Sequence, residues 1–366
     1  CEVRETGEEY AATYRDDAGE LHARIRSRSV SVTDLYDVLG DLRGATETVR
    51  RLASGRILWI EETDGTGEPL RALLCDLLAR SLIREHTFAL YRCAEETERE
   101  IASQLGFLPV PGESVLLYAD MRAPIVLLED TLQCIKEPFA SDEAVRAAVE
   151  STRPALRKSI CAMFPGTLLL CFDMDAINDG LIEKVRALNG VSNVPPTQKT
   201  LGRAMCVPYG KILAETIVPN TVTKALHADK VFHANESGFD IEESPGYSQL
   251  SNQVKTIKSF RRPVLLVDDL LHNGYRWEKL DPLFRGQGVE VERILVGILS
   301  GRGLDLMREQ KRNVDCEYFI PNMRYWFTES LLYPFIGGDS VSGGIVERDY
   351  PPSINLILPY QYPKYL

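Results

Sequence analysis

Short apolar blocks alternate with polar ones, and they predict strands and helices throughout the first half of the chain. The alternation over residues 21–25 predicts a strand, and the apolar run 57–60 predicts a buried one. Gly65-Thr66-Gly67 interrupts the pattern, and Pro69 suits the first turn of a helix that runs to about Leu82. Further expected elements are helices over 31–51 and 94–105 and strands over 88–91, 115–118 and 125–128.

Strand and helix alternate more regularly in the second half, which predicts a parallel sheet with right-handed crossovers. Residues 167–172 are a continuous apolar run, typical of a strand buried on both faces. Residues 193–250 are rich in Pro, Thr, Asn and Gly and are expected to be mostly loops. The other expected elements are helices over 142–164, 182–188, 275–284 and 305–311 and strands over 263–267, 293–299 and 316–320.

Length and composition limit the class of protein. The 366 residues suffice for about two domains, and 44% hydrophobic with 26% charged residues indicates a globular fold. The net charge of −11 gives no basic field for nucleic acid, and no apolar run reaches the ~20 residues of a membrane span. The eight cysteines favour reduced, buried thiols in the cytoplasm. We interpret the start at Cys1 as a fragment that could have a further domain upstream.

The strongest motif covers residues 264–276. Four apolar residues predict a central strand, Asp268 and Asp269 follow at its carboxyl end, and Gly274 introduces a helix. Ligands of open α/β sheets bind at this end of the strands, and the start of a helix suits a phosphate. Two carboxylates there can accept hydrogen bonds from vicinal hydroxyls or hold Mg²⁺. The pattern indicates a site for a ribose 5-phosphate group.

This motif resembles the PRPP-binding motif of type I phosphoribosyltransferases. The match covers the strand, the acid pair, Leu270, Leu271 and Gly274. The resemblance implies that the PRPP site is formed by Asp268, Asp269, Leu270, Leu271, His272, Asn273, Gly274, Tyr275 and Arg276. Four of these, His272, Asn273, Tyr275 and Arg276, stand where small hydroxyl residues are usual in the family. We expect Arg276 to point at the 5-phosphate, because a guanidinium makes paired, charge-assisted hydrogen bonds to phosphate.

The order of elements after residues 264–276 is also similar to that of the type I phosphoribosyltransferases. An aromatic residue that stacks on the acceptor base follows a late strand in the purine-specific members, and Tyr325, Trp326 and Phe327 are the matching residues here. The alternative is an aromatic cluster in the core. By the same resemblance, Asp339 joins Asp268 and Asp269 as an expected Mg²⁺ contact.

Upstream, the resemblance implies that residues 167–172 are the first strand and that the next loop holds pyrophosphate. That loop, Asp173-Met174-Asp175, is acidic instead of basic. The resemblance implies that a mobile loop after this strand supplies a cation, and the candidates are Lys211 or the set Lys224, His227 and Lys230. The three residues of that set lie at helical spacing. Lys224 is the expected catalytic partner of the acid pair, and the alternative is a solvated basic helix face.

Residues 1–125 resemble a degenerate GNAT acyltransferase. The order of strands and helices agrees, with Gly65-Thr66-Gly67 in the position of the loop that wraps the CoA pyrophosphate. Glu62 stands where active members carry Gln or Arg, and Leu105-Gly106-Phe107 lacks the preceding Tyr. We expect this half to have lost acetyl transfer.

The combined hypothesis is an α/β protein with a GNAT-like mixed-sheet domain (1–130), a doubly wound parallel-sheet phosphoribosyltransferase-like domain (131–345) and a Pro/Tyr-rich arm (346–366). The expected reaction transfers ribose 5-phosphate from PRPP to a small-molecule acceptor, with Mg²⁺ as cofactor and pyrophosphate as product. The alternatives are a non-catalytic PRPP or nucleotide sensor and a GNAT-type acyltransferase. No nucleic acid or membrane partner is expected, and a homodimer is considered.

Overall fold

The computed structural model divides the chain into two compact units. Unit 1 comprises Cys1–Leu128, Ala147–Phe172 and Ile320–Phe327, and unit 2 comprises Glu129–Arg146, Asp173–Phe319 and Thr328–Leu366. The structure describes residues 2–6, 8–16, 18–40, 42–53, 55–93, 95–135, 138–192, 201–210, 212–213, 218–233, 238–244, 246–333 and 340–341. Lys211, Asp339 and the arm 346–366 lie outside the described residues.

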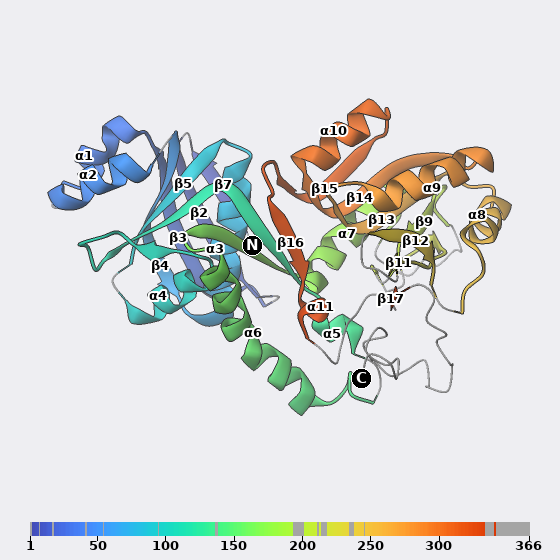
Figure 1. Cartoon of the computed structure of the whole chain (residues 1–366), viewed down its shortest axis with the longest axis horizontal. Helices are drawn as coiled ribbons and strands as arrows, with labels where there is room; N and C mark the ends of the chain where they lie inside the picture. The colour runs from blue at the N-terminus through green and yellow to red at the C-terminus, as the bar shows by residue number, and fades with distance from the viewer. Residues whose placement is uncertain are drawn as a thin grey trace. The chain divides into compact units, whose positions relative to one another are not determined.

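Unit 1 is built on a mixed nine-stranded sheet (Figure 1). The strand order is β1-β2-β3-β4-β5-β7-β16, and β6 and β8 also pair with β7. β4 and β5 are parallel, whereas β1 to β4 pair antiparallel with one another and β5 pairs antiparallel with β7. The strands are β1 (Glu2–Thr6), β2 (Glu9–Arg15), β3 (Leu21–Val30), β4 (Arg56–Gly65), β5 (His86–Arg92), β6 (Leu108–Pro109), β7 (Leu116–Glu129), β8 (Thr167–Asp173) and β16 (Tyr325–Thr328).

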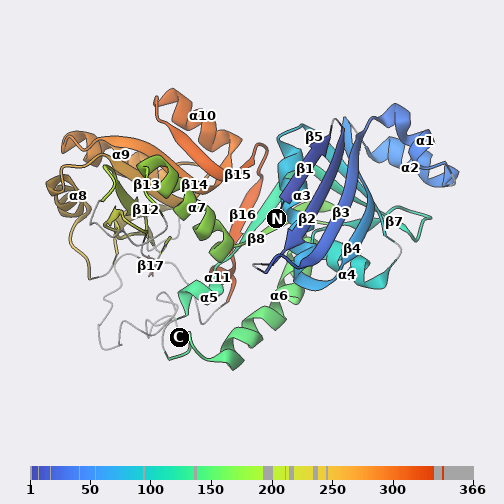
Figure 2. The same ribbon diagram turned by 180° about the vertical axis from the view of Figure 1, so that it is seen from behind.

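Successive residues of a strand face opposite sides of the sheet, so each face carries apolar side chains that helices can cover. Ile57 and Trp59 of β4 pack into a core with η1 (Val32–Asp34), α1 (Leu35–Val38) and α2 (Arg43–Leu52). The helix α3 (Gly67–Leu82) packs on β2, β3 and β4, as Figure 2 shows from behind. Two more helices belong here, α4 (Glu96–Ser103) and most of α6 (Glu143–Met163).

Unit 2 is built on a five-stranded sheet in the order β10-β9-β13-β14-β15, which is 2-1-3-4-5 in chain order. Its strands are β9 (Met205–Pro208), β10 (Val222–Thr223), β13 (Val264–Leu271), β14 (Val291–Ser300) and β15 (Val314–Ile320). The pairs β10–β9, β9–β13 and β13–β14 are parallel. A second sheet joins β11 (Ala228–Phe232) to β12 (Phe239–Glu243) and β17 (Ser340–Val341).

Helices lie on both faces of the parallel sheet. Ile294 and Val296 of β14 share a core with α8 (Leu250–Ser259) and α9 (Tyr275–Gly286), whereas Ile177 of α7 (Met174–Asn189) packs over Gly297, on the opposite face. The remaining helices are α5 (Thr131–Cys134), α10 (Gly301–Glu309) and α11 (Glu329–Leu332). The mixed sheet and the parallel sheet confirm the α/β class.

Two expectations about the strands are wrong. Residues 167–172 do form a strand, but β8 pairs with β7 in unit 1 instead of opening the parallel sheet. A continuous apolar run specifies a buried strand and not its sheet, and β7, at 14 residues, is long enough to pair with further strands. The parallel sheet starts at β9 instead, inside the region expected to be loops, where Pro208 ends the strand.

Seven cysteines lie among the described residues, and none of them is in a disulfide there. Five are buried, Cys75, Cys93, Cys134, Cys171 and Cys206, whereas Cys161 and Cys316 are partly exposed.

Candidate functional site

The acid pair lies at the switch point of the parallel sheet. Among the strands of the parallel sheet taken in chain order, β13 is the third. It pairs with the first, β9, and with the fourth, β14. In sheets of this order, ligands bind beyond the carboxyl ends of the strands where the order reverses. The strand continues through Asp268 and Asp269 to Leu271. The two acids therefore lie within the last residues of β13 and not in the loop that follows it. Asp268 is 8% exposed.

Arg276 lies against both acids. Its Nη1 donates to Asp268 Oδ1 at 2.6 Å and to Asp269 Oδ1 at 2.8 Å. Burial raises the pKa of Asp268 well above its ordinary value. Burial also opposes ionisation of Asp269, but the charge of Arg276 and the hydrogen bonds around the carboxylate lower its pKa. In this arrangement the guanidinium of Arg276 therefore points at the two carboxylates. The expectation that it points at a 5-phosphate stays a prediction.

Tyr209 is a further residue of this site, and the sequence did not reveal it. It follows β9, and its N–H donates to the carbonyl of Val267 at 2.8 Å. The guanidinium of Arg276 lies 4.8 Å from its ring centroid. The hydroxyl is buried and has no hydrogen-bond partner among the described residues. Tyr209, Asp268 and Arg276 line a cavity of about 20 Å³. This volume corresponds to one water molecule and not to a ligand.

The loop between β13 and α9 presents a row of backbone donors. Gly274 has φ +76°, and a Cβ there would lie 2.1 Å from Leu306 Cδ2, so both the backbone conformation and the space favour glycine. Among the described residues, none accepts a hydrogen bond from the backbone N–H groups of residues 272–277. These donors and the positive end of the α9 dipole form an anion cradle, the name used below for residues 272–277.

Arg302 adds a cation to this cradle that the sequence did not identify. It follows β14, and its Nη1 donates to Asn273 Oδ1 at 2.8 Å. His272 Nδ1 lies 2.9 Å from Ser300 Oγ, which caps α10 by accepting from the N–H of Gly303. Burial and the charge of Arg302 lower the pKa of His272, so it is neutral at neutral pH. The missed signal was Ser300-Gly301-Arg302-Gly303 at the end of the neighbouring parallel strand.

The expected basic helix face does not form. Lys224 follows the short strand β10, and its N–H donates to Cys206 O, while Lys230 lies in β11. The imidazole of His227 stacks on Tyr247 at 3.7 Å, and Lys230 Nζ lies 4.6 Å from the Phe239 ring centroid. Strand pairing overrides the helical spacing, so the three residues do not share a face, and the structure gives no contact between Lys224 and the acid pair.

The expected acceptor residues Tyr325, Trp326 and Phe327 lie in β16, which the structure assigns to unit 1, whereas the acid pair belongs to unit 2. Tyr325 packs against Phe164 with ring centroids 5.6 Å apart, and the guanidinium of Arg324 lies 5.0 Å from its ring centroid. Tyr325 is 43% exposed, and Trp326 and Phe327 are partly buried, so the three do not form a core cluster.

The expected pyrophosphate loop is the start of a helix. Asp173 caps α7 by accepting from the N–H groups of Asp175 and Ala176, so a carboxylate already occupies that anion position. The loop after the true first strand begins with Tyr209-Gly210, and Gly210 has φ +62°. Lys211, the next residue, lies outside the described residues.

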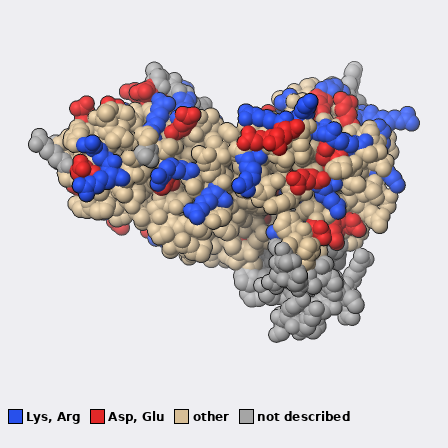
Figure 3. Space-filling model, turned by 45° about the horizontal axis from the view of Figure 1, so that its top comes forward, with Lys and Arg blue, Asp and Glu red and all other residues tan. Residues whose placement is uncertain are grey.

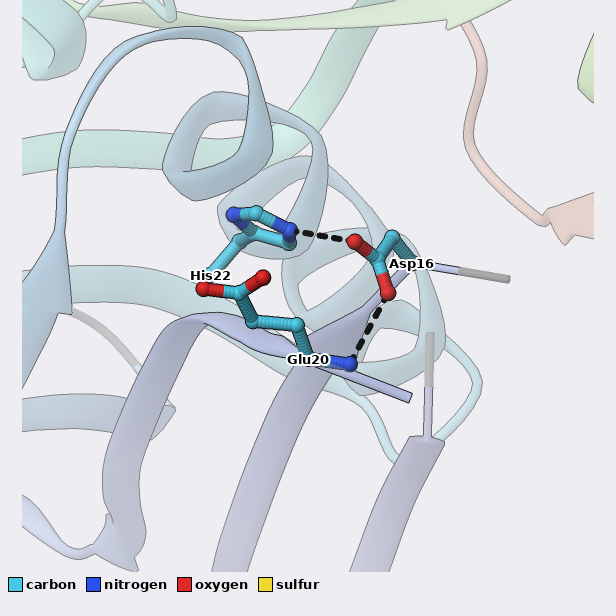
Figure 4. Close-up of side chains that lie close together, drawn as sticks. All are labelled: Asp16, Glu20 and His22. Carbon is cyan, nitrogen blue, oxygen red and sulfur yellow. Dashed lines mark hydrogen bonds and ion pairs between the residues drawn. The ribbon is translucent and has the colours of Figure 1, made fainter. Parts of the chain in front are cut away.

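Two other clusters lie in unit 1. Asp16, Glu20 and His22 bring ligand atoms within 4.8 Å of one another at the β2–β3 hairpin (Figure 4). All three are exposed, and Asp16 is already engaged by the His22 ring at 2.9 Å and the Glu20 N–H at 2.8 Å.

A cleft of about 720 Å³ lies between α4, β6 and α6. Among its charged residues, Lys158 pairs with Glu100 at 2.5 Å and Arg99 with Glu96 at 3.8 Å. Burial raises the pKa of the Cys161 thiol to about 12, so this thiol is not a nucleophile at neutral pH.

Magnesium does not fit the acid pair as arranged. The guanidinium of Arg276 lies against both carboxylates, where a metal ion would need to bind. The expected third contact, Asp339, lies outside the described residues. No step of the proposed function is therefore derived through a metal ion at these acids.

Comparison with models of known protein families gives no match, and comparison with curated protein sequences gives none either. Among the described residues, no helix is both long and apolar enough to cross a membrane. On the face shown in Figure 3, basic and acidic side chains are interspersed.

Proposed function

We propose that unit 2 binds the ribose 5-phosphate group of PRPP and transfers it to a small-molecule acceptor with release of pyrophosphate. The observation that carries this proposal is the position of two complementary groups at one switch point. The acid pair accepts hydrogen bonds from vicinal hydroxyls, and the anion cradle with Arg302 holds a phosphate. Consecutive residues of one strand, loop and helix supply most of both groups.

Each group has a separate role in the proposed reaction. The anion cradle fixes the 5-phosphate through backbone N–H groups, and Arg302 adds a charge-assisted bond. Asp268 and Asp269 orient the ribose and stabilise positive charge at C1 as the bond from C1 to the pyrophosphate oxygen breaks. A bond from C1 to the acceptor then forms as pyrophosphate leaves, and the proton that the acceptor loses passes to solvent water.

Ribose 5-phosphate binding, measured by calorimetry, tests the phosphate half of the site. Arg302→Ala should weaken binding about tenfold or more, since a hydrogen bond to a charged group contributes about 1.5–3 kcal/mol. Arg308→Ala is the matched control, because Arg308 lies on the same helix, is 70% exposed and pairs with Asp305. Equal affinities of the wild type and Arg302→Ala would remove Arg302 from the site.

The acid pair is tested on PRPP itself. The double variant Asp268→Asn, Asp269→Asn keeps the side-chain size but removes the charge, so PRPP affinity should fall by several kcal/mol in a chain that remains folded. Asp305→Asn is the control, since Asp305 is 71% exposed on α10. Unchanged PRPP affinity in the double variant would refute the proposed site.

A sensor that binds PRPP without turnover is the second candidate. One observation favours it: Arg276 already donates to the carboxylate oxygens of the acid pair that ribose hydroxyls would need. A screen for pyrophosphate release with bases, amines and small acids as acceptors separates the two functions. Saturable PRPP binding without pyrophosphate release for any acceptor would favour the sensor.

Unit 1 is proposed as a GNAT-like scaffold without acyl transfer. The order β4, α3, β5, α4 around Gly65-Thr66-Gly67 supports the likeness. At the first turn of α3, Glu68 accepts from Arg71 at 2.7 Å and from Arg157 at 2.7 Å. Glu68 thus occupies both arginines near the start of α3, and its charge opposes the approach of the CoA pyrophosphate.

A further inference from the structure

Arg276 and the acid pair form an unequal ion cluster. One guanidinium serves two carboxylates, so the cluster keeps a net negative charge when both acids are ionised. The side chain of Arg276 is 35% exposed, against 12% for Asp268 and 22% for Asp269. The arginine is therefore the solvent-side member, and it covers the acids that the proposed function needs.

The contacts of Arg276 are few for an arginine against buried acids. Nη1 alone donates to both carboxylates, so the planar fork is not used for paired bonds. Among the described residues, its other guanidinium nitrogens make no hydrogen bond, and the remaining contact is the face of Tyr209. An incoming phosphate would offer the guanidinium the paired geometry that it lacks here.

Building on the proposed function, we propose that Arg276 is a resident counter-ion that determines the specificity of the site. It keeps divalent cations and unphosphorylated diols away from Asp268 and Asp269, because either would have to displace a charge held by two carboxylates. A ligand that also brings a phosphate to the anion cradle gives Arg276 an alternative acceptor beside its own backbone N–H. The site then accepts only ligands that carry both groups.

Binding of Mn²⁺ alone, followed by electron paramagnetic resonance, tests this proposal without PRPP. Arg276→Ala should bind Mn²⁺ about tenfold or more tightly than the wild type, because the acids lose their counter-ion. Adding Asp269→Asn to Arg276→Ala should abolish the gain. Arg276→Gln serves as a second neutral variant if the alanine variant does not fold, and circular dichroism checks both.

Arg285→Ala is the matched control. Arg285 lies on the same helix and donates to Asp281 at 2.5 Å, so its removal also breaks an arginine–aspartate pair. Mn²⁺ affinity should stay at the wild-type value in this variant. An equal gain in Arg285→Ala would show a non-specific effect of lost positive charge and overturn the proposal.

The outcomes separate this inference from the proposed function. If folded Arg276→Ala or Arg276→Gln gains no Mn²⁺ affinity, Arg276 is not the counter-ion, whether or not ribose 5-phosphate binds. If the gain occurs but the wild type does not bind ribose 5-phosphate, the counter-ion role is supported and the phosphoribosyl function fails. Detectable binding of free ribose by Arg276→Ala, but not by the wild type, would support the specificity role directly.

Discussion

Each unit places a cluster of arginine and carboxylate side chains at the start of a helix, and the two clusters have opposite stoichiometry. In unit 1, one carboxylate, Glu68, serves Arg71 and Arg157. Arg157 has no exposed side-chain surface and also donates to Gln104 Oε1 at 3.1 Å, and Arg71 also donates to the carbonyl of Cys171 at 3.1 Å. Both arginines thus keep neutral acceptors besides their counter-ion.

In unit 2, one arginine serves two carboxylates, and the described residues offer Arg276 no neutral acceptor. The buried hydroxyl of Tyr209 beside it also has no partner among them. A cluster whose polar groups are satisfied by fixed neighbours holds a fold together. A cluster that leaves its exposed member with ionic partners alone can exchange that member for a ligand. The difference indicates a structural role for the first cluster and supports the proposal that the second binds a ligand.

The largest expected effect comes from removing the shared carboxylate of unit 1. Glu68→Gln leaves two buried guanidinium groups without a counter-charge, which should lower the free energy of unfolding by about 3 kcal/mol. Urea denaturation measures this. Glu47→Gln is the control, since Glu47 is 54% exposed and pairs with Arg51 on the surface. Equal stability of Glu68→Gln and the wild type would remove the structural role of the cluster.

Gly274 tests whether the anion cradle depends on its backbone conformation. Gly274→Ala combines a positive φ with the approach to Leu306, so we expect a loss of about 2 kcal/mol in unfolding free energy and weaker ribose 5-phosphate binding. Gly190→Ala is the matched control, because Gly190 has φ +65° but no atom within 4 Å of its Cβ position. It should show the backbone strain alone, about 1 kcal/mol, with unchanged binding. Equal losses at both positions would mean that Leu306 moves freely.

Acid should weaken the cluster of unit 1 in a defined pH window. Burial opposes ionisation of Glu68, but Arg71 and Arg157 lower its pKa from 4.5 to about 2. Below pH 4.5 the unfolded chain binds a proton at Glu68 that the folded chain does not, so stability is lost as the pH falls toward 2. The loss should be smaller than that of Glu68→Gln, since the Glu68 side chain is 60% exposed and solvent screens the charge.

Urea denaturation between pH 6 and about pH 2.5 follows this loss. In Glu68→Gln the slope of unfolding free energy against pH should become shallower over the same window, because that titration is absent. Identical slopes in the two proteins would show that other carboxyl groups carry the acid sensitivity.

The sequence predicts the acid pair and its loop because they are contiguous. Four apolar residues, two acids and a glycine specify a strand, a turn and a helix start through local rules alone, and the structure places all of them in one site. The partner of Arg276 could not be predicted in the same way. Whether its guanidinium turns back to the acids or outward to a phosphate depends on the fixed position of α9 relative to β13.

Long-range pairing explains the other differences. The apolar run 167–172 is compatible with either sheet, and its pairing with β7, distant in sequence, places it in the sheet of unit 1. The sequence does not predict the short strand β9, because its four residues, which end at Pro208, give little periodicity. Tyr209, the next residue, could not be predicted as part of the site for the same reason. Residues 224–230 follow a helical period in sequence, yet pairing between β11 and β12 fixes an extended chain.

The smallest expected effect is on coenzyme A, and it closes the comparison between the two helix starts. The N-terminus of α3 follows Gly65-Thr66-Gly67, and the Glu68 carboxylate in its first turn would repel a phosphate while it occupies Arg71 and Arg157. Among the described residues, no carboxylate accepts from the N–H groups at the N-terminus of α9. Calorimetry on the full chain should therefore show no heat of binding for acetyl-CoA and a saturable heat for ribose 5-phosphate. Micromolar binding of acetyl-CoA would show that Glu68 yields to a phosphate, and it would restore the acyltransferase hypothesis for unit 1.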